Sequence, residues 1–216
     1  MTFPGFTESD FDIFSISDFI ARMGAIRIEL RPKLVALGEE LAPRVAELVT
    51  GAMVPHTAAH MRRRTHPPPA TWVAFGRSSR GYKRFVHFRV AAHAGGLRVT
   101  VQIEDDADDK AAFAAALRRD RDLLLDRLSR QKDLVWYTLS NGGEEPVTGS
   151  QLTAADLEHL AQTLGTVKTA DFSAGIPFDR NDARLRSPAD LSPLLLDTMR
   201  RLVPLYEAAL PSSVDG

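Results

Sequence analysis

The chain has 216 residues and a formal net charge of -1, from 27 basic and 28 acidic residues. It contains no cysteine, which excludes disulfides, thiolate metal sites and cysteine nucleophiles. No apolar run reaches the roughly 20 residues of a membrane-spanning helix, and the N-terminus lacks the basic and apolar regions of a signal peptide. We therefore expect a soluble cytoplasmic protein with no membrane partner.

The charge is distributed unevenly along the chain. Between Glu47 and Glu104 there is no Asp or Glu, whereas this segment holds nine Lys and Arg residues and five of the six histidines. The remainder of the chain is correspondingly acidic. A segregation of charge of this kind indicates an anionic partner for the basic segment.

The first 50 residues have the pattern of helices. Thr7 is a candidate N-cap for a short helix among the N-terminal phenylalanines. Apolar residues then recur every three or four positions from Phe19 to Leu48, which predicts a long amphipathic helical region. Pro32 is expected to break or restart this helix, and Pro43 to kink or end it.

The periodicity changes to two after an irregular segment, residues 50–70, which contains four prolines. Strands are predicted at Thr71–Phe75, Tyr82–Val90 and Leu97–Ile103, joined by glycine-containing turns. Three consecutive strands with short turns predict an antiparallel meander, covering about residues 71–103.

Helices and strands are predicted in turn over the second half of the chain. The helices are expected from about Lys110 to Arg130, from Thr153 to Leu164 and from Ser187 to Tyr206, and the strands at Leu134–Leu139 and Val167–Ala174. The sequence therefore predicts a single α+β domain over residues 1–210, in which several helices pack on an antiparallel sheet, and a disordered tail over 211–216.

The most distinctive motif is a pair of histidines four residues apart, His56 and His60, followed by three arginines. In a helical turn the two imidazoles would share one face and could hold an anion, or a metal ion with His87 or His93 as a third ligand. No Glu follows His56, so the motif is not that of a zinc protease. Two partly exposed histidines near a helix end are the plainer interpretation.

A second candidate site begins at the Gly/Ser-rich turn before Tyr82. Backbone amides of this turn, flanked by Arg80 and Lys83, could cradle a phosphate. Aromatic residues alternate with cations here, as in sheets that stack single-stranded bases, although a half-buried strand with a solvated basic face gives the same pattern. The predicted ligand-binding residues are His56, His60, Arg62, Arg63, Trp72, Arg80, Tyr82, Lys83 and His87.

The acidic run Glu104–Asp109 follows the third predicted strand. It lacks the glycine and the closing glutamate of an EF-hand loop. We expect it to complement the dipole of the helix that follows and to neutralise part of the basic segment. No cofactor is expected from the sequence.

Several stretches of the chain match a known family. They include Gly5-Phe6-Thr7-x-x-Asp10-Phe11, Ala21-Arg22-Met23-x-Ala25-Ile26-Arg27, Pro55-His56-x-Ala58-x-His60, and Thr71-Trp72-Val73-Ala74-Phe75. On these residues the chain resembles the YktB-like family of uncharacterised bacterial proteins, a domain of unknown function. The resemblance spans nearly the whole chain, with a poorly matching region from Val90 to Leu152. It implies an α+β fold with an antiparallel sheet, without a known activity.

Three functions remain open at this point. The first, which we favour, is a module that binds a phosphorylated small molecule or a single-stranded nucleic acid on a basic, aromatic-bearing surface formed by residues 55–90. The second is a small enzyme acting on an anionic substrate, with His56 and His60 as acid and base or as metal ligands. The third is a protein–protein interaction module, for example a homodimer in which the basic surface meets the acidic remainder.

Overall fold

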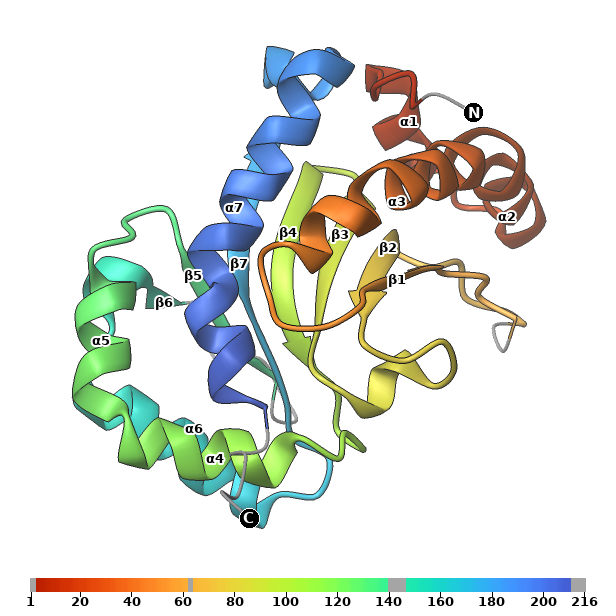
Figure 1. Cartoon of the computed structure of the whole chain (residues 1–216). Helices are drawn as coiled ribbons and strands as arrows, with labels where there is room; N and C mark the ends of the chain where they lie inside the picture. Colours follow the sequence, from red (N-terminus) through yellow and green to blue (C-terminus); the bar gives the residue numbers. More distant parts are fainter. Residues whose placement is uncertain (1–2, 62–63, 140–146, 211–216) are drawn as a thin grey trace. The chain divides into compact units, whose positions relative to one another are not determined.

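The computed structural model describes residues 3–61, 64–139 and 147–210, and they form an antiparallel sheet together with helices (Figure 1). Within these residues the sheet has seven strands in the order β1-β2-β3-β4-β7-β5-β6. The strands are β1 (Val54–Thr57), β2 (Ala70–Gly76), β3 (His87–His93), β4 (Gly96–Ile103), β5 (Val135–Leu139), β6 (Val147–Thr148) and β7 (Asp171–Asp179). The predicted α+β fold with an antiparallel sheet is confirmed.

Along the chain, helices precede the first strand and then alternate with strands in the second half. The α-helices are α1 (Glu8–Asp12), α2 (Phe19–Ala25), α3 (Arg31–Ala46), α4 (Lys110–Arg119), α5 (Arg121–Ser129), α6 (Ala154–Thr166) and α7 (Pro188–Ala208). Short 3₁₀ helices are η1 (Ile13–Ser15), η3 (Tyr82–Arg84), η4 (Gly149–Gln151) and η5 (Ala183–Leu185), and η2 (Ile26–Leu30) is a π-helix. None of the helices in the described residues is long and apolar enough to cross a membrane.

The chain divides into two compact units. The first contains residues 1–75, 89–99 and 177–200, and the second contains residues 76–88, 100–176 and 201–216. The single domain over 1–210 stays a prediction, and the predicted tail over 211–216 lies outside the described residues.

The core of the first unit is built from the N-terminal phenylalanines and from α3. The ring centroid of Phe6 lies 5.2 Å from that of Phe3 and 6.0 Å from that of Phe11. An apolar stripe at helical spacing is fully buried on α3. Gly38 allows this helix to approach β2 closely, because a Cβ atom at Gly38 would lie only 2.8 Å from Cγ2 of Val73.

The helical region before β1 is continuous through α2, η2 and α3 (red to orange in Figure 1). The expected break at Pro32 takes the form of a widened turn, in which the N–H of Arg31 donates to the carbonyl of Ile26, five residues earlier. Pro32 has no N–H to donate to the preceding turn, and the π-helix ends immediately before the first turn of α3, where proline is tolerated. Pro43 lies inside α3, which continues to Ala46.

The strand predicted over Tyr82–Val90 is wrong in its first half. Gly81 adopts a φ of 62°, in the left-handed region that favours glycine. The N–H groups of Arg84 and Phe85 then donate back to the carbonyls of Gly81 and Tyr82, which closes the 3₁₀ helix η3. The turn therefore extends beyond its glycine, and β3 begins only at His87.

The core of the second unit is formed by α4, α5 and α6 together with Trp136 of β5 and Phe172 of β7. Phe172 packs against Phe113 at 4.9 Å and against Trp136 at 4.6 Å between ring centroids. The single helix predicted up to Arg130 is divided at Asp120, whose φ of -106° and ψ of 18° are not helical.

Candidate functional site

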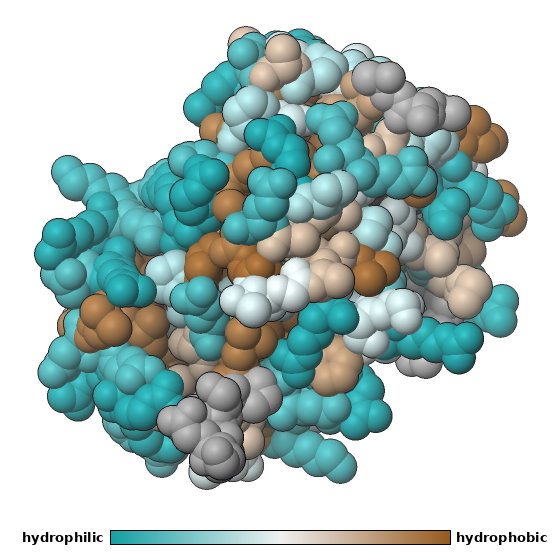
Figure 2. Space-filling model, viewed as in Figure 1, coloured by the Kyte–Doolittle hydropathy of each residue, from teal (hydrophilic) through white to brown (hydrophobic). Residues whose placement is uncertain are grey.

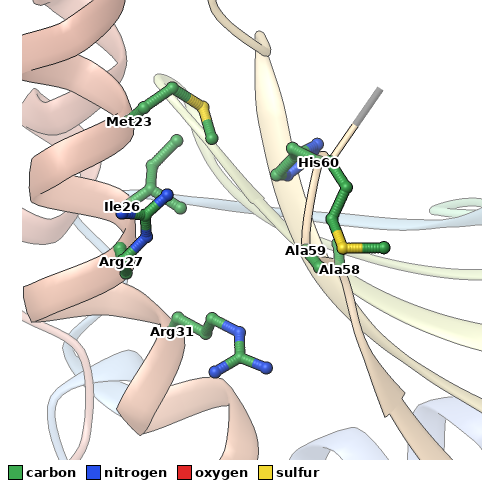
Figure 3. Close-up of a pocket in the computed structure, with 8 residues that line it drawn as sticks. Met23, Ile26, Arg27, Arg31, Ala58, Ala59 and His60 are labelled. Carbon is green, nitrogen blue, oxygen red and sulfur yellow. The ribbon is translucent and has the colours of Figure 1, made fainter. Parts of the chain in front are cut away.

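A cavity of about 220 Å³ lies in the first unit, between the helical region α2–η2–α3 and the segment that follows β1 (Figure 3). Its lining residues come from these two stretches, which are far apart in the sequence: Met23, Ile26, Arg27 and Arg31 on the helical side, and Ala58, Ala59, His60 and Met61 on the other. The stretches that carry the family resemblance near Met23 and Ala58 thus line opposite walls of one cavity.

The π-helix lies at the centre of the helical wall, between Met23 of α2 and Arg31 of α3. Its widened turn is closed by the hydrogen bond from the N–H of Arg31 to the carbonyl of Ile26, and both residues line the cavity. Arg27 lies inside this turn. A π-turn within an α-helix is rare and often occurs at functional sites.

The opposite wall contains the backbone outlier of the described residues, His60. Its φ of 50° lies in the left-handed region, which non-glycine residues seldom adopt. The ring is held in place, with Nε2 at 3.1 Å from the hydroxyl oxygen of Thr71 and the ring centroid 5.2 Å from that of Trp72, edge to face. Strained backbone of this kind persists where the surroundings fix it and is frequent at binding sites.

The cavity carries positive charge without an acidic counterpart. Arg27 and Arg31 are exposed, neither has an ion pair or a side-chain hydrogen bond within the described ranges, and no Asp or Glu lines the cavity. The two arginines are four residues apart on a helix, where like charges repel. An anion between them would relieve this repulsion and accept charge-assisted hydrogen bonds.

Arg22 fixes the position of α2. Its Nε donates to the carbonyl of Ile16 at 2.5 Å, and its Nη1 donates to the carbonyl of Pro68 at 3.2 Å. The guanidinium therefore links the helix that carries Met23 to the proline-rich segment that follows the other wall of the cavity.

The two histidines of the sequence motif lie on different backbone. His56 belongs to β1, so the helical turn that would place both imidazoles on one face does not form. His60 lines the cavity and His56 does not. Arg62 and Arg63 lie outside the described residues. In the part of the chain that the structure describes, no group of three His, Asp or Glu side chains is arranged to hold a metal ion.

The predicted site residues of the second unit surround the η3 turn. Tyr82 contacts His87 edge to face, with 5.0 Å between ring centroids. His87 is completely buried, and its Nδ1 lies 2.9 Å from the carbonyl oxygen of Phe85. Arg80 and Lys83 are exposed. The structure thus gathers the predicted residues into a first-unit group with His60 and Trp72 and a second-unit group around Tyr82.

The acidic run neutralises much of the basic segment in the second unit, as expected from the sequence. Asp109 pairs with Arg77 at 2.8 Å, Arg84 pairs with Asp108 at 2.7 Å, and Lys83 lies 3.8 Å from Glu104. The local excess of positive charge around η3 is therefore smaller than the sequence count indicates.

A second cavity, of about 340 Å³, lies at the β3–β4 turn of the first unit and is lined in part by His93 and Arg98. Nδ1 of His93 accepts a hydrogen bond from the N–H of Gly95 at 3.1 Å. Burial, together with the charge of Arg98, lowers the pKa of His93 below its usual 6.5. The imidazole is therefore held in its neutral form.

Sequence reasoning missed Arg27 and Arg31 as site residues. The charge count directed attention to the segment without Asp or Glu. These arginines precede that segment and lie two residues on either side of Glu29. The available signal was the spacing of two like charges at i and i+4 on a predicted helix, which is unfavourable without a counterion.

Comparison with known proteins agrees with the resemblance. A family model described as "Domain of unknown function (DUF1054)" matches residues 6–206. A UPF0637 protein of Bacillus velezensis is 31% identical over 95% of this chain and 97% of its own length. Similar UPF0637 proteins of Bacillus mycoides and Shouchella clausii are each 30% identical, over 95% and 97% of this chain and 98% and 97% of their own lengths. The chain belongs to the DUF1054 family, which is the YktB-like family that its sequence motifs indicated.

Proposed function

We propose that the protein binds a small phosphorylated molecule in the cavity between the α2–η2–α3 helix and His60. The observation that carries this proposal is the pair Arg27 and Arg31, which line the cavity without an acidic side chain among the lining residues that the structure describes. Guanidinium groups bind phosphate oxygens through paired, charge-assisted hydrogen bonds. His60, held by Thr71 and Trp72, supplies a further polar group on the opposite wall.

A small ligand is favoured over a single-stranded nucleic acid. The cavity volume of about 220 Å³ is below the range of roughly 300–1,000 Å³ for drug-sized ligands. Base stacking needs an accessible aromatic face, and Trp72 is only partly exposed. The guanidinium carbon of Arg89 lies 4.6 Å from the centroid of the Trp72 ring. His60 also contacts this ring, edge to face.

Titration with methyl phosphate, followed by calorimetry, tests the proposal. We expect binding that weakens as the salt concentration rises, because exposed charges are screened. Arg27→Gln and Arg31→Gln should each weaken binding roughly tenfold to hundredfold, the effect of losing hydrogen bonds to a charged group.

Arg44→Gln is the matched control, since Arg44 is exposed on α3 and does not line the cavity. It changes the net charge by the same amount and should leave the affinity within about twofold, the scale of an exposed charge effect. If all three variants lose the same affinity, the effect comes from net charge alone, and the cavity is not the binding site. The absence of any binding of methyl phosphate would overturn the proposal itself.

An enzymatic role of the same cavity would depend on His60, because His56 is not among the lining residues. Histidine transfers protons near neutral pH. Release of inorganic phosphate from methyl phosphate, measured in the same samples, separates binding alone from turnover. Turnover that His60→Gln abolishes while binding persists would establish the enzymatic alternative.

A further inference from the structure

We infer that the ligand of this cavity is a phosphate monoester that carries a short apolar group. This inference rests on the proposed function and specifies the class of ligand. Of the eight lining residues in the described part of the chain, three are polar or charged, namely Arg27, Arg31 and His60. The other five are Met23, Ile26, Ala58, Ala59 and Met61, so the walls offer apolar contact next to the cationic groups.

The apolar walls continue outward onto exposed side chains. Met61 lines the cavity and is nevertheless 80% exposed, and Ile20 is 79% exposed. Ile20 lies one helical turn before Met23, and residues three apart on a helix are neighbours on its surface. Met61 and Ile20 therefore extend the apolar surface of the cavity beyond its two walls.

Large apolar side chains with this degree of exposure gather in the helical region beside the cavity. Ile28 in η2 is 74% exposed, and Figure 2 shows hydrophobic residues at the outer edge of the region where α2 lies in Figure 1. Single exposed apolar residues are normal in proteins, whereas apolar residues clustered beside a pocket often mark a binding site. The flexible thioethers of Met23 and Met61 can adapt to apolar groups of different shape.

The position of the charges indicates how such a ligand would lie. Arg27 and Arg31 are four residues apart and define one strip of the helical wall, where the phosphate would bind. Met23 precedes Arg27 by four residues, so it extends the same strip with an apolar side chain. The apolar group of the ligand would lie along Met23 and Met61, one from each wall.

A homologous series of alkyl phosphates tests this inference. We expect the affinity to rise from methyl to butyl to hexyl phosphate by roughly twofold to fourfold for each methylene that is buried, following the area that is removed from water. Hexanol serves as a probe without the charge and should bind far more weakly than hexyl phosphate. Equal affinity for all three phosphates would overturn the inference.

Met61→Ser removes one apolar side chain from the cavity wall at an exposed position, so the fold should tolerate it. It should weaken hexyl phosphate at least fivefold while leaving methyl phosphate within about twofold, because only the longer ligand reaches the side chain. Met61→Leu should restore the affinity. Leu123→Ser is the matched control, since Leu123 is also an exposed apolar residue but lies on α5 and does not line the cavity.

The outcomes separate this inference from the proposed function. If methyl phosphate binds in a manner that depends on Arg27, and butyl and hexyl phosphate bind no more tightly, the proposed anion site stands and the inference of an apolar group is wrong. Failure of every phosphate to bind would overturn both. The phosphate monoester could belong to a lipid headgroup or to a soluble molecule, and vesicles of phosphatidylcholine that contain phosphatidic acid, itself a phosphate monoester, distinguish the two. Co-sedimentation with these vesicles that depends on Arg27 indicates a lipid headgroup. Binding of hexyl phosphate without co-sedimentation indicates a soluble ligand.

Discussion

Arg77 and Asp109 form a partly buried ion pair that fixes the η3 turn of the second unit. Nη2 of Arg77 donates to Oδ1 of Asp109 at 2.8 Å, while Oδ2 accepts from the N–H of Val86 at 2.7 Å. Asp109 is 2% exposed, and the guanidinium also lies 4.2 Å from the ring centroid of Phe85. Both carboxylate oxygens are thus used to hold the segment between β2 and β3.

Asp109→Asn should therefore lower the free energy of unfolding by about 2–4 kcal/mol, because it removes the charge opposite Arg77, which is itself partly shielded from water. Urea denaturation measures the change. Asp108→Asn is the control, since the Asp108–Arg84 pair is exposed on both sides and should contribute less than about 1 kcal/mol. Equal effects of the two substitutions would show that burial does not strengthen the Asp109 pair.

Tyr206 should ionise only at a pH above the ordinary range of tyrosine. Burial raises its pKa from 10 to about 12, and its ring stacks on Phe88 at 4.8 Å between centroids. Since the folded state holds the phenolic proton more tightly than the unfolded chain, stability should be unaffected below pH 10 and should fall as the pH rises from 10 towards 12. Tyrosinate absorbance measures the titration, and Tyr206→Phe should remove the late step. A late step that persists in this variant would assign it to another tyrosine.

The backbone of His60 should determine which substitutions are tolerated there. Its φ of 50° favours Asn or Gly and disfavours β-branched residues. We expect His60→Val to be less stable than His60→Asn by about 1–2 kcal/mol, measured by urea denaturation. Both variants lose the imidazole, so the difference between them reports the backbone. Equal stabilities would contradict a left-handed conformation at this position.

Stability should also respond to the titration of His93. Burial and the neighbouring Arg98 lower the pKa of His93 below 6.5, so the unfolded chain takes up this proton at a higher pH than the folded protein does. The stabilisation is fully present above pH 6.5 and decreases as the pH falls below it. His93→Gln should flatten the pH dependence of unfolding between pH 7 and 5, measured by urea denaturation at each pH. The same pH dependence in the variant and in the original protein would contradict this assignment.

Local sequence patterns predicted the elements that depend on near neighbours. Apolar residues at helical spacing predicted the helical region from Phe19 onward, and alternation predicted β2 and β4 within a residue or two of their ends. The predicted ends of strands and helices were wrong where the backbone conformation of a single residue sets them. The turn at Gly81 continues into η3 and shortens β3, and Asp120 divides the helix predicted to reach Arg130.

The sequence by itself determined the fold class, the family and one wall of the candidate site, because periodicity and the motif around His60 are local properties of the chain. Only the tertiary structure placed Arg27 and Arg31 opposite His60, since more than 25 residues of chain separate them. It also showed that carboxylates from the acidic run neutralise Arg77 and Arg84. A charge count along the chain cannot distinguish a paired arginine from an unpaired one, because pairing depends on distances that folding alone sets.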